Sequence, residues 1–252
     1  MEQKAFYDDP GFDYLGYWRK REYEHRVEVD LLGRILPKKA ESLLDVGAGY
    51  GRLLPVYRKR FERIVFLDPS EKLLSLARVK YGKKGLTYRM GVASKLPFRR
   101  ESFQVVICIR VFHHLNSEEA KKTLEEMARV LVSGGTAFLE YANKIHLRAR
   151  LRAIFSGKKS WVEEFDTIDR RGFRNVIGGS IPFNNFHPER IKEWAEEAGF
   201  KVKEHYSLSY LRPSFFKNFL PISFLVKVDS FLQEKISGQN WGPSNLVVLE
   251  KI

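Results

Sequence analysis

The sequence contains one cysteine, Cys108, and no run of about 18 apolar residues. A single cysteine excludes an intramolecular disulfide and a metal site built from several cysteines. The thiol lies in the apolar run VVICI, which predicts a buried strand and an inert side chain. No residues have the spacing of metal ligands, so we expect no metal. Because no apolar segment follows Met1 either, we expect a cytoplasmic protein without a stable transmembrane association.

The chain has 252 residues and a formal net charge of +13. This length is sufficient for one α/β domain with a full core and insertions. The charge has two interpretations, attraction to an anionic partner such as RNA or a membrane surface, or a solvated basic surface. The basic residues are spread along the chain and form no dense tail, which favours the second interpretation.

Apolar runs alternate with segments of helical spacing. The runs that predict strands include RIVFLD, SFQVVICI and TAFLEY, and helices are expected near 51–61 and over TLEEMARVLV, with Ser133 to Gly135 ending the latter. Asn116 and Glu119 form a capping-box pattern, while Ser70 and Pro188 mark two further helix starts. Strands alternating with helices at these lengths imply a parallel, doubly wound α/β sheet.

Three glycines, Gly47, Gly49 and Gly51, follow the apolar strand that ends at Asp45. Glycine allows positive φ and a close approach of the backbone to a ligand. The helix N-terminus after such a turn favours a carboxylate or phosphate. A dinucleotide fingerprint needs G-x-G-x-x-G, but here the third glycine comes one place early and Arg52 occupies the last position.

The stretch D-x-G-x-G-x-G resembles the first motif of class I S-adenosylmethionine-dependent methyltransferases. The resemblance covers about residues 40–140 and 187–206, and LPFRRESFQVVICIRVFHHL and LEEMARVLVSGG are closest to the type-11, UbiE-like branch. It implies a Rossmann-like, seven-stranded, mostly parallel sheet with an antiparallel last strand, helices on both faces and helical insertions that form a lid. It also implies S-adenosylmethionine as cofactor and S-adenosylhomocysteine as product.

We expect one domain over residues 1–252. Its parts are an N-terminal helical cap (1–40), a cofactor-binding core (41–141), two lid insertions (142–186 and 208–243), and the remaining helix and strands (187–207 and 244–252). The insertions contain basic amphipathic stretches, which could cover a substrate, touch a lipid surface or simply cover the sheet edge.

The resemblance assigns Asp68 to the ribose hydroxyls and Asp45 to the amino-acid end of the cofactor. Their alternative roles are to form a turn before Pro69 and to cap the glycine turn. Val92 stands where the family often has an acidic residue, so it offers only backbone and apolar contact to the adenine. The expected cofactor-binding residues are Asp45, Gly47, Ala48, Gly49, Gly51, Asp68, Pro69, Val92, Ala93, Ile109 and Arg110.

Candidates for a proton acceptor or orienting group are His113, His114, Glu140 and Tyr141. The histidine pair could instead pack or cap at the end of its strand. The candidates for acceptor contact are Tyr17, Trp18, His146, Asn185 and His187.

Methyl transfer to a small-molecule or lipid-like acceptor is the expected function, by in-line displacement. RNA of the tRNA type is the alternative acceptor, and a non-catalytic cofactor-binding protein is a third possibility. The single buried cysteine argues against a cysteine-nucleophile route, and the absence of an N/D-P-P-Y/F/W sequence argues against methylation of the adenine amino group. The oligomeric state stays open.

Overall fold

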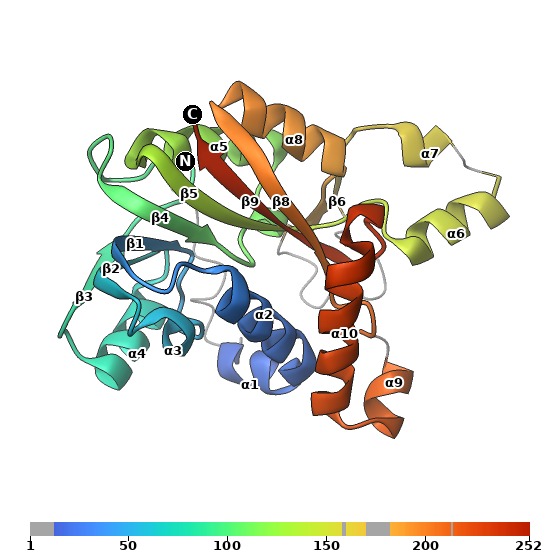
Figure 1. Ribbon diagram of the computed structural model, residues 1–252, viewed down its shortest axis with the longest axis horizontal. Helices are drawn as coiled ribbons and strands as arrows, with labels where there is room; N and C mark the ends of the chain where they lie inside the picture. Colours follow the sequence, from blue (N-terminus) through green and yellow to red (C-terminus); the bar gives the residue numbers. More distant parts are fainter. Residues whose placement is uncertain (1–12, 158–159, 170–181, 213) are drawn as a thin grey trace.

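The computed structural model describes residues 13–157, 160–169, 182–212 and 214–252. Its main feature is a seven-stranded sheet of order β3-β2-β1-β4-β5-β9-β8 (Figure 1). The strands are β1 (Ala40–Val46), β2 (Phe61–Asp68), β3 (Leu86–Met90), β4 (Phe103–Cys108), β5 (Leu131–Ala142), β8 (Phe200–Leu208) and β9 (Ser244–Lys251). Strands β1 to β5 pair in parallel, and β9 is antiparallel to both of its neighbours. The predicted sheet with an antiparallel last strand is confirmed.

Helices cover both faces of this sheet (Figure 1). One face packs against α2 (Glu22–Ile35), α3 (Leu54–Tyr57), α4 (Glu71–Tyr81) and α10 (Ile222–Ile236). The other packs against α5 (Ser117–Val130) and α8 (Pro188–Glu197). Shorter elements are α1 (Tyr14–Arg19), η2 (Phe112–His114), α6 (Leu147–Phe155), α7 (Ser160–Glu163), β6 (Ile168–Asp169), β7 (Asn184–Asn185), α9 (Ser214–Phe219) and η3 (Ser237–Gln239).

Successive side chains of a strand point to opposite faces of the sheet, so each strand contributes to two separate parts of the core. Along β2, Ile64 and Phe66 join the cluster beneath α2, whereas Val65 and Leu67 join the cluster beneath α5. Because both faces are covered, the strands have near-continuous apolar runs, as expected for a parallel sheet.

The sequence signals for helix starts are confirmed. Asn116 accepts from the backbone N–H of Glu119, whose side chain accepts from the N–H of Asn116, which completes the capping box at α5. Ser70 accepts from Leu73 at the start of α4, and Pro188 occupies the first turn of α8.

Two predicted boundaries are wrong. The helix expected near 51–61 spans only Leu54–Tyr57, because the chain turns at 58–60 and Phe61 already belongs to β2. The helix α5 ends at Val130, before the Ser-Gly-Gly sequence, which lies inside β5. Phe103 pairs with Leu131 but Val105 pairs with Thr136, so residues 132–135 bulge from the ladder.

The segment 208–243, expected as a lid, is partly a layer of the fold. Helix α10 packs along α2, where Leu225 is fully buried. Tyr23 of α2 donates a hydrogen bond to the buried carboxylate of Asp229. This part of the segment therefore covers the sheet, as one of the alternatives proposed.

Candidate functional site

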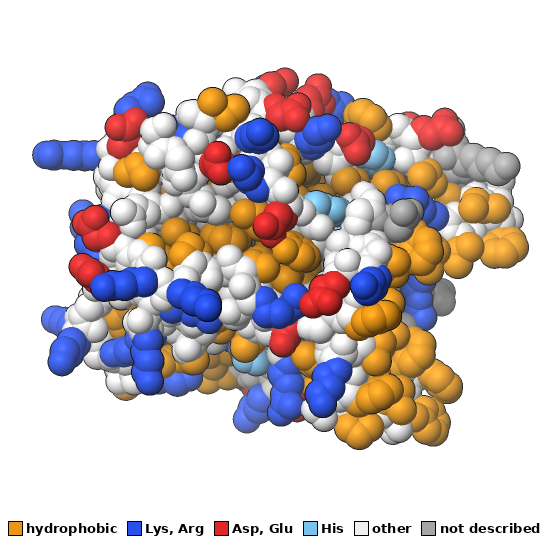
Figure 2. Space-filling view, in the orientation of Figure 1, with side chains coloured by type: hydrophobic (Ala, Val, Ile, Leu, Met, Phe, Trp, Pro, Cys, Tyr) orange, Lys and Arg blue, Asp and Glu red, His pale blue; other side chains and the backbone are white. Residues whose placement is uncertain are grey.

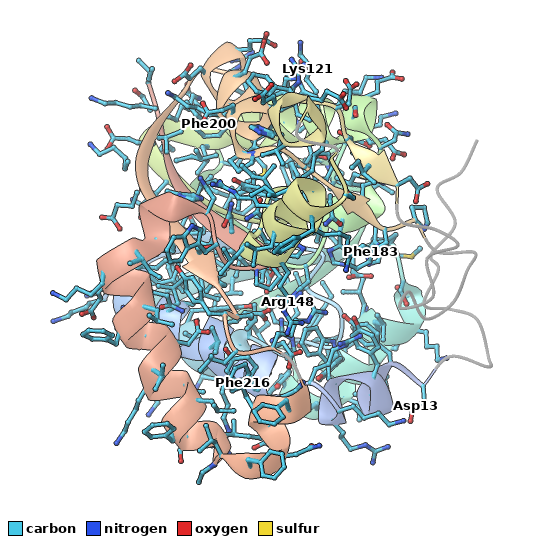
Figure 3. All side chains as sticks on the ribbon, turned by 90° about the vertical axis from the view of Figure 1, so that its right-hand side faces the viewer. Asp13, Lys121, Arg148, Phe183, Phe200 and Phe216 are labelled. Carbon is cyan, nitrogen blue, oxygen red and sulfur yellow. The ribbon has the colours of Figure 1, made fainter. Side chains whose placement is uncertain are left out.

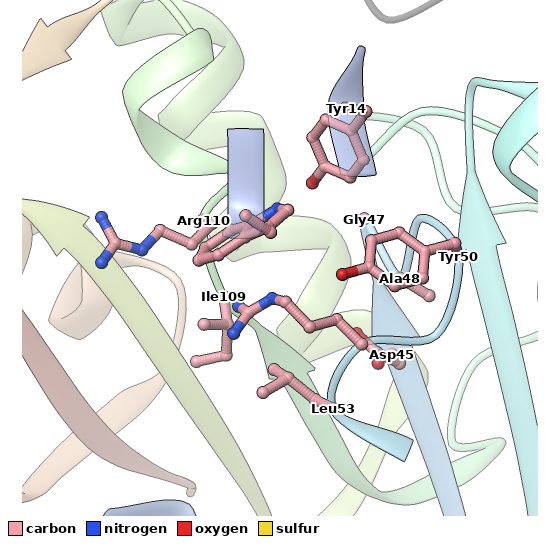
Figure 4. A pocket seen from close by; sticks show the side chains of 10 residues that line it. Tyr14, Asp45, Gly47, Ala48, Tyr50, Leu53, Ile109 and Arg110 are labelled. Atoms are coloured by element: carbon pink, nitrogen blue, oxygen red, sulfur yellow. The ribbon is translucent and has the colours of Figure 1, made fainter. Parts of the chain in front are cut away.

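A pocket lies where β1 and β4 end at the same edge of the sheet. Its space, open mouth included, is about 320 Å³. Figure 4 shows Tyr14 and Tyr50 on one side of it and Ile109 and Leu53 nearer the strands. The lining residues are Tyr14, Trp18, Asp45, Gly47, Ala48, Tyr50, Arg52, Leu53, Ile109 and Arg110.

The glycine turn needs glycine for two separate reasons. Gly47 and Gly51 both have φ of +74°, a left-handed backbone that side chains rarely adopt. A Cβ on Gly47 would come within 2.2 Å of Cγ2 of Val111, and one on Gly51 would come within 2.7 Å of the ring of Phe66. The turn is thus held close to its neighbours, with its backbone lining the pocket.

Asp68, at the end of β2, fixes this turn. Its carboxylate oxygens accept from the backbone N–H groups of Gly49 at 2.8 Å and Ser70 at 2.9 Å, and the residue is 6% exposed. The turn-forming role is confirmed. A carboxylate offers about four acceptor positions, so these bonds are compatible with the predicted role toward ribose hydroxyls.

Asp45 lies at the base of the pocket, buried beside the hydroxyl of Tyr57, which donates to it. Burial raises the pKa of Asp45 to about 7, against the opposing effects of the Tyr57 hydrogen bond and the charge of Arg52. This carboxylate therefore titrates near neutral pH. In the described part of the chain its partner is Tyr57, and no N–H group of the turn donates to it, so the predicted capping role is wrong.

Buried glutamates neutralise the arginines of the pocket. Glu28 of α2 is 1% exposed and pairs with Arg52 at 2.7 Å and Arg110 at 2.5 Å. Burial by itself would raise the pKa of Glu28, but the two guanidinium groups bring it below its ordinary value. The backbone N–H of Arg110, a residue at φ +64°, donates to Glu140 at 2.9 Å. Arg52 also stacks over the ring of Trp18, 3.7 Å from its centroid.

The histidine pair lies in η2, a few residues after the end of β4 and just after Arg110. The rings of His113 and His114 are 3.9 Å apart, and His113 also lies 4.9 Å from the ring of Phe183. Burial, followed by the neighbouring His114 and arginines, lowers the pKa of His113 well below its usual range, and burial lowers that of His114 to about 4. Both rings are therefore uncharged at pH 7, and neither belongs to the lining of the pocket.

Several predicted residues have structural roles. Tyr141 is in the core, where its hydroxyl accepts from Asn245 at 3.1 Å, so a catalytic role is not supported. Glu140 positions Arg110, as described above. His187 caps α8 by accepting from the N–H of Glu189 at 3.2 Å.

The remaining predicted residues divide between the pocket and its surroundings. Trp18, predicted to contact the acceptor, lines the same pocket as Asp45, Gly47, Ala48, Ile109 and Arg110. Tyr17 stacks on Tyr14 with ring centroids 6.2 Å apart. The residues outside the lining are Gly49, Gly51, Asp68, Pro69, Val92, Ala93, His146 and Asn185.

Sequence reasoning missed four lining residues, Tyr14, Tyr50, Arg52 and Leu53. Three of them lie inside or directly after the glycine turn, so their place in the motif was an available signal. Tyr14 lies in the aromatic N-terminal segment, where the sequence alone does not indicate which ring faces the turn.

A family profile described as methyltransferase domain matches residues 44–139. The chain is 28% identical over 127 residues to an uncharacterized methyltransferase of Bacillus subtilis, a match that spans 49% of each protein. It is 29% identical over 196 residues to the ubiquinone/menaquinone biosynthesis C-methyltransferase of Methylococcus capsulatus, covering 73% of this chain and 75% of that one.

Solved structures share the fold. A methyltransferase from Haloferax volcanii, solved in complex with the Trm112 methyltransferase activator, superposes with a TM-score of 0.65 at 20% identity, covering 98% of both chains. The magnesium protoporphyrin IX methyltransferase of Synechocystis, solved with S-adenosylhomocysteine, gives a TM-score of 0.58 at 16% identity over 98% of this chain and 91% of that one.

Proposed function

We propose that this chain, which is an S-adenosylmethionine-dependent methyltransferase, methylates a small-molecule or lipid-like acceptor. The main support for this proposal is that the charged side chains around the pocket form ion pairs with one another. The arginines next to the cofactor pocket are neutralised by buried glutamates, and the adjoining His113 and His114 are uncharged. A site whose charges are paired in this way suits an apolar or aromatic acceptor better than a phosphate backbone, which needs unpaired basic groups.

The lining of the pocket supports S-adenosylmethionine as the ligand. Its turn has no room for a Cβ on Gly47, which would meet Val111, and its walls combine the aromatic rings of Tyr14 and Tyr50 with the buried carboxylate of Asp45. In our proposal Asp45 faces the amino-acid end of S-adenosylmethionine and Asp68 accepts the ribose hydroxyls. Val92 and Ala93, beside the end of β3, would contact the adenine through backbone and apolar atoms.

When bound, S-adenosylmethionine supplies a sulfonium methyl group that a nucleophile of the acceptor displaces in line. The chain contributes alignment and exclusion of water. Trp18, 7% exposed and held under the guanidinium of Arg52, lines the pocket. Glu140 holds the backbone of Arg110 in its left-handed conformation and thereby fixes the strand end at which acceptor and cofactor would meet.

The relatives include C- and O-methyltransferases of ubiquinone biosynthesis, and this supports an apolar aromatic acceptor. RNA is the second candidate, favoured by the net charge of +13. Either acceptor is compatible with the same cofactor half of the site.

A labelling experiment separates the two candidates. The protein is incubated with methyl-labelled S-adenosylmethionine and either an organic extract of small molecules and lipids or total RNA. We expect label in the organic phase. Label that is precipitated with RNA and released by ribonuclease, with none in the organic phase, would contradict the proposal.

Two variants accompany this experiment. Asp68→Ala should abolish labelling and calorimetric binding of S-adenosylmethionine, because it removes the anchor of the glycine turn. Glu62→Ala, which removes an exposed carboxylate from β2, is the matched control and should change neither.

A further inference from the structure

Apolar side chains are exposed on one side of the molecule, over α6, α9 and α10 as far as Phe231. Figure 2 shows them gathered on the right-hand side and below it, and Figure 3 turns this side toward the viewer. Nine of the sixteen large apolar side chains exposed in the described residues are here. They are Leu147, Leu151, Ile154, Phe155, Phe215, Phe219, Leu220, Phe224 and Phe231, which we call the apolar face.

The exposure on this face is high. Phe155 is 87% exposed, Phe219 73% and Phe215 66%. In α6 the buried residues are the small Ala149 and Ala153, so this helix turns its larger apolar side chains outward. Contiguous exposed apolar surface of this kind marks an interaction site on a stable protein.

The exposed charged residues of α6, α9 and α10 up to Phe231 are basic, and the exposed Glu234 near the end of α10 pairs with Arg34 of α2 at 3.7 Å. Helix α6 contains three arginines and no acidic residue, and α9 contains Lys217 and no acidic residue. The acidic residue between 214 and 231 is Asp229, which is fully buried against Tyr23. The side chains of Arg148, Arg152 and Lys227 form no ion pair with any described residue, and Figure 3 places Arg148 between α6 and α9.

From this combination we infer that the apolar face docks on an anionic lipid surface. Helices with phenylalanine and leucine on one side and lysine or arginine beside them lie in the interface of a bilayer. Anionic headgroups attract each nearby basic residue. No helix in the described ranges has the length and apolar character of a membrane span, so contact would be peripheral. Helix α7, which carries the exposed Glu163, lies above α6 in Figure 1 and is not part of this face.

The inference goes beyond the proposed function, since docking is compatible with any acceptor. It would bring the carboxyl edge of the sheet, where the pocket lies, toward a lipid phase from which an apolar acceptor could enter.

Vesicle flotation of the full chain tests it. We expect binding to phosphatidylcholine vesicles that contain 30% phosphatidylglycerol, and much weaker binding to phosphatidylcholine alone or at 0.5 M salt. The double variant Phe215→Ser, Phe219→Ser should bind at least tenfold more weakly. Val79→Ser, which alters an 88% exposed apolar residue on α4, is the matched control and should bind like the unaltered chain.

The charges are tested separately. Arg148→Gln with Arg152→Gln should weaken binding to anionic vesicles by about fivefold per charge, whereas Arg99→Gln with Arg100→Gln, on the loop before β4, should have little effect. All variants should bind S-adenosylmethionine normally, which shows that they are folded and separates this test from that of the function. The inference is overturned if the unaltered chain does not float with anionic vesicles, or if the phenylalanine variant floats equally well. It is also overturned if light scattering shows a dimer that the phenylalanine variant dissociates.

Discussion

Asp45 should make binding of S-adenosylmethionine depend on pH near neutrality. Its carboxylate lines the pocket in which we place the cofactor, and burial raises its pKa to about 7. If Asp45 faces the ammonium group of the cofactor, as we propose, only the ionised carboxylate attracts that group. Affinity should therefore rise with pH through about 7, and binding should in turn lower the pKa of Asp45.

The magnitude follows from the ionised fraction. With a pKa of about 7, Asp45 is about 9% ionised at pH 6 and about 76% ionised at pH 7.5. If the protonated form contributes no attraction, the apparent Kd falls by the ratio of these fractions, about eightfold, which corresponds to about 1.3 kcal/mol. An α-amino group with a pKa of about 7.7 to 8.0 is about two-thirds charged at pH 7.5, which reduces the expected change to about sixfold without changing its direction.

Isothermal titration calorimetry at pH 6.0, 6.5, 7.0 and 7.5 and constant ionic strength measures this dependence. The control is Asp45→Asn, which keeps the size of the side chain and the acceptor for the hydroxyl of Tyr57. Its Kd should be nearly constant over the window and should resemble that of the unaltered protein at low pH. A Kd that does not change with pH, or an equal slope in Asp45→Asn, would refute the reasoning.

Two further predictions concern the frame of the pocket. Glu28→Gln leaves two buried arginines without their shared counter-charge and should lower the free energy of unfolding, measured by urea titration, by about 3 kcal/mol. Glu22→Gln, at an exposed ion pair, should change the free energy of unfolding by less than about 1 kcal/mol. Equal effects of the two variants would contradict the role of burial. Gly47→Ala brings a methyl group against Val111 and should weaken cofactor binding and lower the melting temperature. Gly82→Ala, with a similar φ of +69° but open space around it, isolates the backbone strain, so an equal loss in both variants would show that the contact with Val111 does not matter.

The local features of the fold could be predicted from the sequence because each depends on neighbouring residues. The capping box at Asn116, the Ser70 cap and the glycine turn all act over a few positions. The bulge at Gly134 was missed for the opposite reason: Ser-Gly-Gly is a normal helix end, and only the pairing of Leu131 with Phe103 places it inside a strand.

The chemistry of the pocket was predicted only where it lies in the motif. Asp45, Gly47 and Ala48 were found, but Glu28 was not, because an acidic residue on a helix ordinarily faces solvent. Its burial depends on Arg52 and Arg110, which are 24 and 82 residues away in the chain. The low pKa values of His113 and His114 likewise depend on burial, which no local pattern specifies.

The position of Glu28 also determines how much of the chain the cofactor site needs. The family profile begins at residue 44, yet Tyr14 and Trp18 line the pocket and Glu28 holds both of its arginines. Without α1 and α2, Arg52 would lose its ion pair with Glu28 and Arg110 would keep only Glu140, 3.9 Å away, so the pocket would carry more positive charge. We therefore propose that the N-terminal helices are needed for cofactor binding, because Glu28 offsets positive charge beside the pocket in which we place a positively charged cofactor.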